Sequence, residues 1–331
     1  PGQQQQGQGR GGVGGEVAVR RMYALLVLAR LASQSPECQM DAVREGALPP
    51  LLLLAARGGP QERAHSCRLL ALLGQAAPTH GRFKELGVVE AVLPLLRWPP
   101  AAPHPAHHAP GGDPGVGEHA ASVLAVLAHN PDMHFHMVSC GVVPALLPLL
   151  ANGTSRSRGY ALACLLLLSE GDQRHAAVVA RAGALQPLLR LAEAVAEDEG
   201  AEEEEGERVS LQAAAAAADG SPIPRAGGSS RKVQEFAAAV LCSLSRYLEL
   251  KTELAQLGAL PPLLSCLSGG SQLAATYAAE ALVHLAAGEA GAKRHIAAHA
   301  PARSALQRLL RAGGPGGTYW ALQLLRTLST E

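Results

Sequence analysis

Histidines are the residues of this chain whose types and spacing come nearest to those of a metal site. His104, His107 and His108 lie close together, and imidazole nitrogens bind transition metals such as Zn²⁺. Their spacing is not that of a zinc finger and no cysteine joins them, so we favour a low-complexity loop over a metal site. His134 and His136 allow the same two interpretations, metal ligands or surface side chains. We therefore predict neither a metal nor any other cofactor.

A glycine pattern of the kind that binds dinucleotides occurs at Gly7, Gly9 and Gly12. Such a pattern works only between a strand and a helix, because the helix N-terminus must point at the phosphates. Here it lies in a Gln/Gly-rich tail with no strand before it. The chain also lacks the GxSxG, HExxH and Walker A patterns. We therefore do not expect an enzyme.

The cysteines indicate a reducing compartment. No two of the six are spaced as a CxxC pair, and they are scattered along the chain at Cys38, Cys67, Cys140, Cys164, Cys242 and Cys266. This pattern is typical of free thiols in a cytoplasmic or nuclear protein. No apolar run approaches the roughly 18 residues that a membrane span needs. We expect the protein in the cytoplasm or the nucleus.

Composition favours closely packed helices. Hydrophobic residues make up 48% of the chain, but aromatic residues only 3%, which is typical of a Leu/Ala/Val core rather than a β-rich one. The formal net charge of zero hides a segregation, since nine acidic residues and no basic one lie between Glu193 and Glu207. The rest of the chain is mildly basic, without the concentrated basic stripe of a nucleic-acid-binding protein.

A sequence motif of ten residues recurs along the chain. It starts at Gly46, where it reads Gly-Ala-Leu-Pro-Pro-Leu-Leu-Leu-Leu-Ala, and successive copies start 41, 54, 42, 75 and 43 residues further on. The glycine is suited to end one helix, because only Gly enters the left-handed conformation without a penalty. Prolines that follow it suit the first turn of the next helix. The later copies start at Gly87, Gly141, Gly183, Gly258 and Pro301.

A longer helix is predicted after each copy of the motif, and one more before the first copy, with a Leu-x-x-Leu pair that begins four residues after a small residue. Small residues there let neighbouring helices approach closely, as stacked repeats require. The pairs are Leu28/Leu31, Leu70/Leu73, Leu124/Leu127, Leu165/Leu168, Leu241/Leu244, Leu282/Leu285 and Leu325/Leu328, and the small residues are Ala24, Ser66, Ala120, Ala161, Ala237, Ala278 and Ala321.

This unit of about 42 residues resembles the armadillo repeat. The resemblance implies an all-α, right-handed α-solenoid over residues 16–331, with about five full repeats and a partial one at each end. We expect residues 1–15 to be a disordered Gly/Gln-rich tail. Two inserted loops are predicted where the spacing lengthens, at 99–117 (rich in Pro, His and Gly) and at 193–230 (acidic, then poly-Ala, then Pro/Gly). The missing leading helices suggest that the chain begins within an array.

In armadillo proteins the long helices line a groove that binds extended peptides. The importin-α branch carries a ladder of Asn there, which this sequence lacks, so we do not expect it to read nuclear localisation signals. That Asn position is one residue before the second Leu of each pair, and in this chain aromatic or imidazole rings recur seven residues before it. Seven residues return a helix to within about 20° of the same direction, so these rings face the groove or its flank. They are Tyr23, His65, His119, Tyr160, Phe236, Tyr277 and Trp320.

Two interpretations of these rings stay open. Rings give an extended partner segment flat contact surfaces and cation–π contacts, with Arg30, Arg68 and His284 as polar selectors beside them. Alternatively, the rings pack between successive repeats as core. The acidic run within 193–230 is also open to two interpretations, a solvated loop or a segment that folds over the basic repeats in place of a ligand.

We expect a non-catalytic scaffold that binds an extended peptide segment of another protein. We do not expect a nucleic acid, a membrane span or a small-molecule ligand. The alternative is that the array is the substrate-recognition region of a larger enzyme, such as a U-box-type ubiquitin ligase. The resemblance to armadillo repeats permits both.

Overall fold

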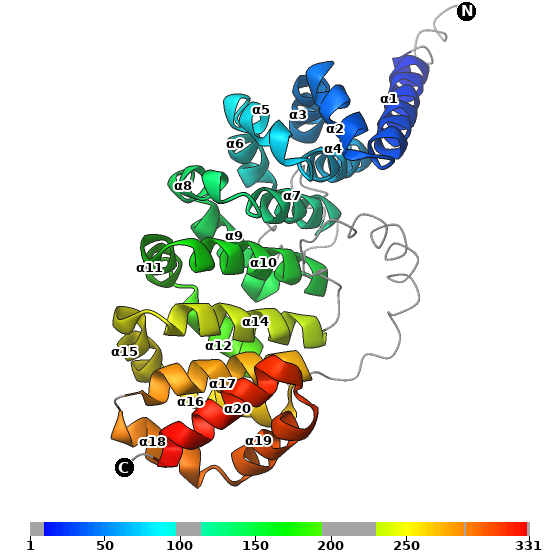
Figure 1. Cartoon of the computed structure of the whole chain (residues 1–331). Coiled ribbons are helices and arrows are strands. Elements are labelled where there is room, and N and C mark those ends of the chain that lie inside the picture. Colours follow the sequence, from blue (N-terminus) through cyan, green and yellow to red (C-terminus); the bar gives the residue numbers. More distant parts are fainter. Residues whose placement is uncertain (1–9, 97–113, 194–229, 288, 330–331) are drawn as a thin grey trace, which may run out of the picture. The chain divides into compact units, whose positions relative to one another are not determined.

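The computed structural model describes residues 10–96, 114–193, 230–287 and 289–329, and all its regular elements in these ranges are helices (Figure 1). The chain divides into two compact units between Val142 and Val143, which are treated separately. The first unit contains α1 (Arg10–Ala32), α2 (Pro36–Arg44), α3 (Leu48–Arg57), α4 (Pro60–Leu73), η1 (Ala77–Thr79), α5 (His80–Glu85), α6 (Val88–Val92), η2 (Leu93–Leu96), α7 (Pro114–Leu127) and α8 (Pro131–Ser139).

The second unit repeats the order short, middle and long helix, which confirms the predicted repeat. Its long helices α10, α14, α17 and α20 lie side by side in Figure 1, each packed against the next. The elements are α9 (Val142–Asn152), α10 (Ser155–Gly171), α11 (Gln173–Arg181), α12 (Leu185–Glu193), α14 (Ser230–Ser245), α15 (Leu248–Gln256), α16 (Leu260–Gly269), α17 (Gln272–Ala286), α18 (Ala290–Ala298), α19 (Ala300–Ala312) and α20 (Gly314–Ser329).

The recurring glycines adopt the left-handed backbone conformation that the sequence predicts. Gly183 has φ +90° and Gly258 has φ +75°, and each stands between a short helix and a middle helix. Gly46, Gly87 and Gly141 share this left-handed conformation. Where Pro301 takes the place of the glycine, the chain turns at His299 with φ −78° and α19 begins directly afterwards. A proline fits there because the first turn of a helix needs no backbone N–H partner.

The predicted small residues and leucines form the core of the second unit. Ala161, Ala237, Ala278 and Ala321 are all fully buried, so successive long helices approach closely. The leucine pairs of α10, α14 and α17 are buried as well. In α20 the first leucine of the pair, Leu325, is instead 37% exposed.

Side chains fix where two of the long helices begin. Thr154 accepts a hydrogen bond from the backbone N–H of Ser157 at the start of α10, and Ser271 accepts one from Ala274 at the start of α17. Each bond satisfies an N–H that has no partner inside the helix. These caps place Tyr160 and Tyr277 at the same position of their helices.

Some predicted boundaries differ from the structure. The tail was predicted to extend to residue 15, but α1 begins at Arg10, although the glycines of residues 10–15 have low helix propensity. Likewise α7 begins at Pro114, inside the predicted loop 99–117. The remainder of both inserted loops lies outside the described residues. The C-terminal repeat, predicted to be partial, contains all three helices α18, α19 and α20.

Among the described residues, no single helix is both long and apolar enough to cross a membrane. Within the same part of the chain, α8 and α9 reach that length and apolarity as a pair, but the chain bends by 85° between them.

Candidate partner-binding surface on the long helices

Three rings stand partly exposed at equivalent positions of the long helices in the second unit. They are Tyr160 on α10, Tyr277 on α17 and Trp320 on α20. Because these helices and α14 pack in succession, the rings share one face of the layer. We call this the ring face. It contains the rings that the sequence predicts for partner binding in this unit, with one exception.

The exception is Phe236 on α14, which is only 7% exposed. Helix α14 packs against α10 and α17, and Phe has no polar tip that would be drawn toward water, as Tyr has. For Phe236 the burial agrees with the second interpretation of the rings, packing between repeats. It is therefore a core residue and is not available as a contact surface.

At the C-terminal end of the ring face, three rings cluster. The imidazole of His284 on α17 meets the indole of Trp320 edge to face, with ring centroids 5.8 Å apart. Tyr319 packs against Trp320 in the same manner at 5.0 Å and is 54% exposed. The sequence predicts His284 and Trp320 for binding, and the packing of α17 on α20 brings them together. The sequence analysis did not predict Tyr319 as a binding residue, because it does not lie at the repeat position that Trp320 shares with the other recurring rings.

A buried carboxylate lies beside this cluster. Oε1 of Glu280 accepts hydrogen bonds from Nη2 of Arg246 at 2.8 Å and from its Nε at 3.2 Å, and Nε2 of His284 lies 3.7 Å away. Burial alone would raise the pKa of Glu280, but His284 and Arg246 outweigh it and hold that pKa below its ordinary value. Glu280 is therefore ionised at neutral pH and anchors Arg246 at the ring face.

Carboxylates from three helices act electrostatically on Tyr277. Burial raises the pKa of its phenol most, and Cys242 raises it further, followed by Glu170 on α10, Glu280 on α17 and Glu235 on α14. Tyr277 therefore remains a neutral ring among acidic groups. No pattern in the sequence pointed to Glu170 or Glu235, because their effect on Tyr277 depends on the packing of α10, α14 and α17.

Polar bonds tie neighbouring helices of the second unit together. Ser169 on α10 donates from Oγ to Oγ of Ser243 on α14 at 3.1 Å, and the hydroxyl of Tyr247 donates to the carbonyl of Ser169 at 3.2 Å. Gln234 on α14 donates to the carbonyl of Ala192 on α12 at 2.9 Å. Buried bonds of this kind hold the register between repeats, since leaving any of these groups unpaired costs free energy.

The first unit contains the other predicted binding residues. Tyr23 is 67% exposed on α1, and Arg30 lies on the same helix with its side chain in solvent. His65 and Arg68 lie on α4, which packs against α1 and α7. His119 is partly exposed on α7. These residues all lie on long helices, as predicted.

The predicted histidine loop, with His104, His107 and His108, lies outside the described residues. His134 is buried rather than at the surface, and its Nε2 lies 2.6 Å from the carbonyl oxygen of Ala128. A hydrogen bond to that carbonyl accounts for its burial, because a buried imidazole needs a partner. His136 instead lies near Cys140 and Glu90.

All six cysteines are free. Burial raises the pKa of Cys67, Cys164 and Cys266 to about 12 and holds that of Cys242 well above its ordinary value. These four thiols are therefore protonated and pack as small apolar side chains.

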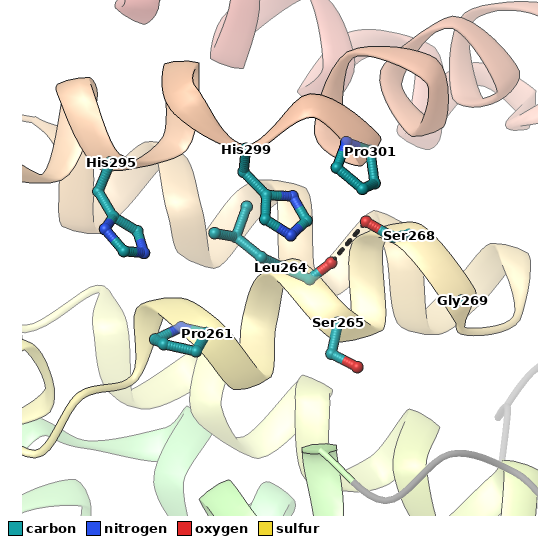
Figure 2. A pocket seen from close by; sticks show the side chains of 8 residues that line it. All are labelled: Pro261, Leu264, Ser265, Ser268, Gly269, His295, His299 and Pro301. Atoms are coloured by element: carbon teal, nitrogen blue, oxygen red, sulfur yellow. Dashed lines mark hydrogen bonds between the residues drawn. The ribbon is translucent and has the colours of Figure 1, made fainter.

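A hollow of about 410 Å³ opens among the shorter helices of the second unit. Figure 2 shows His295 and His299 on one side and Pro261, Leu264 and Ser265 of α16 on the other. The hydroxyl of Ser268 donates its hydrogen bond to the carbonyl of Leu264 at 2.8 Å, so its proton is not available to a ligand in the hollow. None of the predicted binding residues lines the hollow, and its lining residues belong to other helices than the ring face.

Comparison with known proteins defines the fold. The chain is similar to the solved structure of a designed armadillo repeat protein, with a TM-score of 0.62 and 20% identity over 85% of this chain and 100% of the other. A second designed armadillo repeat protein, solved in complex with the peptide (KR)4, has a TM-score of 0.60 and 19% identity over 85% of this chain. The chain therefore has the armadillo-repeat fold, as its sequence predicts.

Curated relatives match only a short stretch. U-box domain-containing protein 11 of Arabidopsis thaliana is 35% identical over 74 residues, and U-box domain-containing protein 13 of the same plant is 32% identical over 78 residues. These stretches are 22% and 24% of this chain and 12% of each relative. No family model matches the sequence.

Proposed function

We propose that this chain is a non-catalytic scaffold that binds an extended segment of a partner protein along its ring face. The observation that carries this proposal is the row formed by Tyr160, Tyr277 and Trp320, partly exposed on three long helices of one layer. Large rings bury much area at little cost in conformational entropy, which is why they dominate binding surfaces. Repeats that stack in register present such rings at regular intervals to an extended chain.

The surroundings of Tyr277 favour a segment that carries a basic side chain. Glu170 and Glu235 place negative charge near this ring, whereas the charge of Glu280 is already paired with Arg246. A guanidinium or ammonium group stacked on the ring would gain both cation–π and ion-pair attraction. The peptide (KR)4 bound to the designed armadillo repeat protein is a basic segment of this kind.

Trp320 and His284 would form a second subsite along the same segment. Their edge-to-face contact fixes the indole, and Tyr319 beside it adds exposed apolar area. Arg246, held by Glu280, adds a positive charge next to these rings. A segment with a basic residue followed by an apolar or acidic residue would match both subsites. We place this interaction in the cytoplasm or the nucleus.

A second candidate function is substrate recognition within a U-box-type ubiquitin ligase. The stretches shared with U-box domain-containing proteins 11 and 13 favour it. In that case the ring face would hold the substrate, and ubiquitin transfer would belong to another part of a longer protein. A ubiquitination assay of the full-length protein with purified E1 and E2 enzymes distinguishes this candidate from a scaffold without a catalytic module.

Selection from a library of random peptides tests the proposal directly. The immobilised chain should enrich peptides that contain Arg or Lys, because basic side chains fit the acidic surroundings of Tyr277. The variant Tyr160→Ala/Tyr277→Ala/Trp320→Ala, shown to be folded by circular dichroism, should lose this enrichment. The same peptides recovered from both proteins would assign binding to another surface and refute the ring face.

A further inference from the structure

Glu90, His136 and Cys140 converge at one point of the first unit. His136 lies in the last turn of α8 and Cys140 directly follows this helix, so their four-residue spacing places both on one helical face. Glu90 reaches them from α6, fifty residues before Cys140. The metal-binding atoms of the three side chains all lie within 4.8 Å of one another.

The distances between these atoms are close to those around a bound ion. Sγ of Cys140 lies 3.3 Å from Oε1 of Glu90, and Nε2 of His136 lies 3.5 Å from the same oxygen. Sγ is 3.7 Å from Nδ1 and 3.8 Å from Nε2 of the imidazole. Tetrahedral Zn²⁺, with bonds of about 2.0–2.3 Å, separates its ligand atoms by about 3.3–3.6 Å. An ion therefore fits with side-chain shifts of a few tenths of an ångström.

The ligand set selects the kind of metal. A thiolate, an imidazole and a carboxylate together suit Zn²⁺ and its spectroscopic substitute Co²⁺, whereas Mg²⁺ and Ca²⁺ prefer oxygen ligands alone. Access is open, because the carboxylate side chain of Glu90 is 51% exposed while the imidazole of His136 is 16% exposed. The ion can thus enter from solvent and retain a water as its fourth ligand.

We infer that Glu90, His136 and Cys140 form a site for one tetrahedral transition metal ion, with Zn²⁺ as the best-matched ion. On binding, Cys140 releases its thiol proton to solvent, and the Sγ–metal bond replaces the hydrogen bond from Sγ to Glu90. The ion links α6 to α8, two elements from successive repeats. This site is separate from the ring face and needs none of its residues.

Titration of the metal-free chain with Co²⁺ tests the site. A tetrahedral Co²⁺ ion with a thiolate ligand produces a ligand-to-metal charge-transfer band and intense visible absorption. We expect both to appear and to saturate at one ion per chain. Zn²⁺ should then abolish them by displacing Co²⁺, and Zn²⁺ alone should raise the melting temperature.

Matched variants locate the ion. Cys140→Ala and His136→Ala should remove the charge-transfer band and the rise in melting temperature, while circular dichroism stays unchanged. Cys38→Ala, which removes the other partly exposed thiol, should retain both signals. So should His104→Gln/His107→Gln/His108→Gln, which removes the predicted histidine loop as a source of ligands. Absence of the band in the unmodified chain, its persistence in Cys140→Ala, or its loss in either control would overturn the proposal.

Discussion

Phe236 and Tyr277 occupy the same position of successive long helices, yet one is core and the other lies partly at the surface. The sequence pattern places both rings correctly along their helices. It cannot tell how deeply each ring is buried, because that depends on the neighbours α10, α17 and α20 rather than on the helix itself. The chemical difference between the two rings, a single hydroxyl, agrees with their different exposure.

Stability measurements should separate these two rings. Phe236→Ala should lower the free energy of unfolding by about 3–5 kcal/mol, because it leaves a cavity in the core. Tyr277→Ala should cost about half as much, because part of that ring already contacts water. Urea denaturation of both variants checks the order. A larger loss for Tyr277→Ala would mean that Tyr277 packs between repeats.

Glu280 should make stability depend on pH. Its folded-state pKa is lowered, so its ionised form stabilises the fold above its unfolded pKa of about 4.3. That contribution is lost as the pH falls through the lower folded-state value. Glu280→Gln should therefore be less stable than the unmodified chain at pH 7, and the gap should close in acid. Urea denaturation at pH 7 and in acid measures the difference in free energy of unfolding between the two proteins. A difference that does not depend on pH would contradict this role of Glu280.

At the scale of the elements, the helix order was predictable because its signals are local. The recurring glycine, the proline after it and the leucine pair each act within a few residues of the chain. The start of α1 at Arg10 was not predictable, because nothing local marks it. The grouping of Glu170, Glu235 and Glu280 around Tyr277 was not predictable either, because these carboxylates come from three helices.

Two glycines provide a matched test of the element boundaries. An added Cβ would meet nothing within 4 Å at Gly183 or at Gly291, but only Gly183 has a positive φ, of +90°. Gly183→Ala should lower the free energy of unfolding by about 1 kcal/mol, because alanine is strained in that conformation. Gly291→Ala, in the first turn of α18, should not lower it, because its φ is not positive and alanine is the better helix former. Equal effects in thermal denaturation would contradict the role assigned to the recurring glycine.

At the scale of the molecule, stacked repeats turn a local pattern into a continuous surface. Each long helix of the second unit contacts its neighbours, so a ring at one position of the repeat becomes a row along the layer. The fold therefore follows from the sequence period alone. The binding chemistry does not, because it depends on which side chains of different repeats become neighbours.

Fluorescence anisotropy of a labelled octapeptide that alternates Arg with Leu, titrated with the chain and two variants, tests the central claim most directly. We predict saturable binding to the unmodified chain, and for Tyr277→Ala a loss of about 2 kcal/mol, roughly 30-fold in Kd. Phe135→Ala, which removes a ring that is 77% exposed on α8, should bind as the unmodified chain does. No binding by the folded chain, or equal binding by Tyr277→Ala, would contradict the ring face as the site for a basic segment.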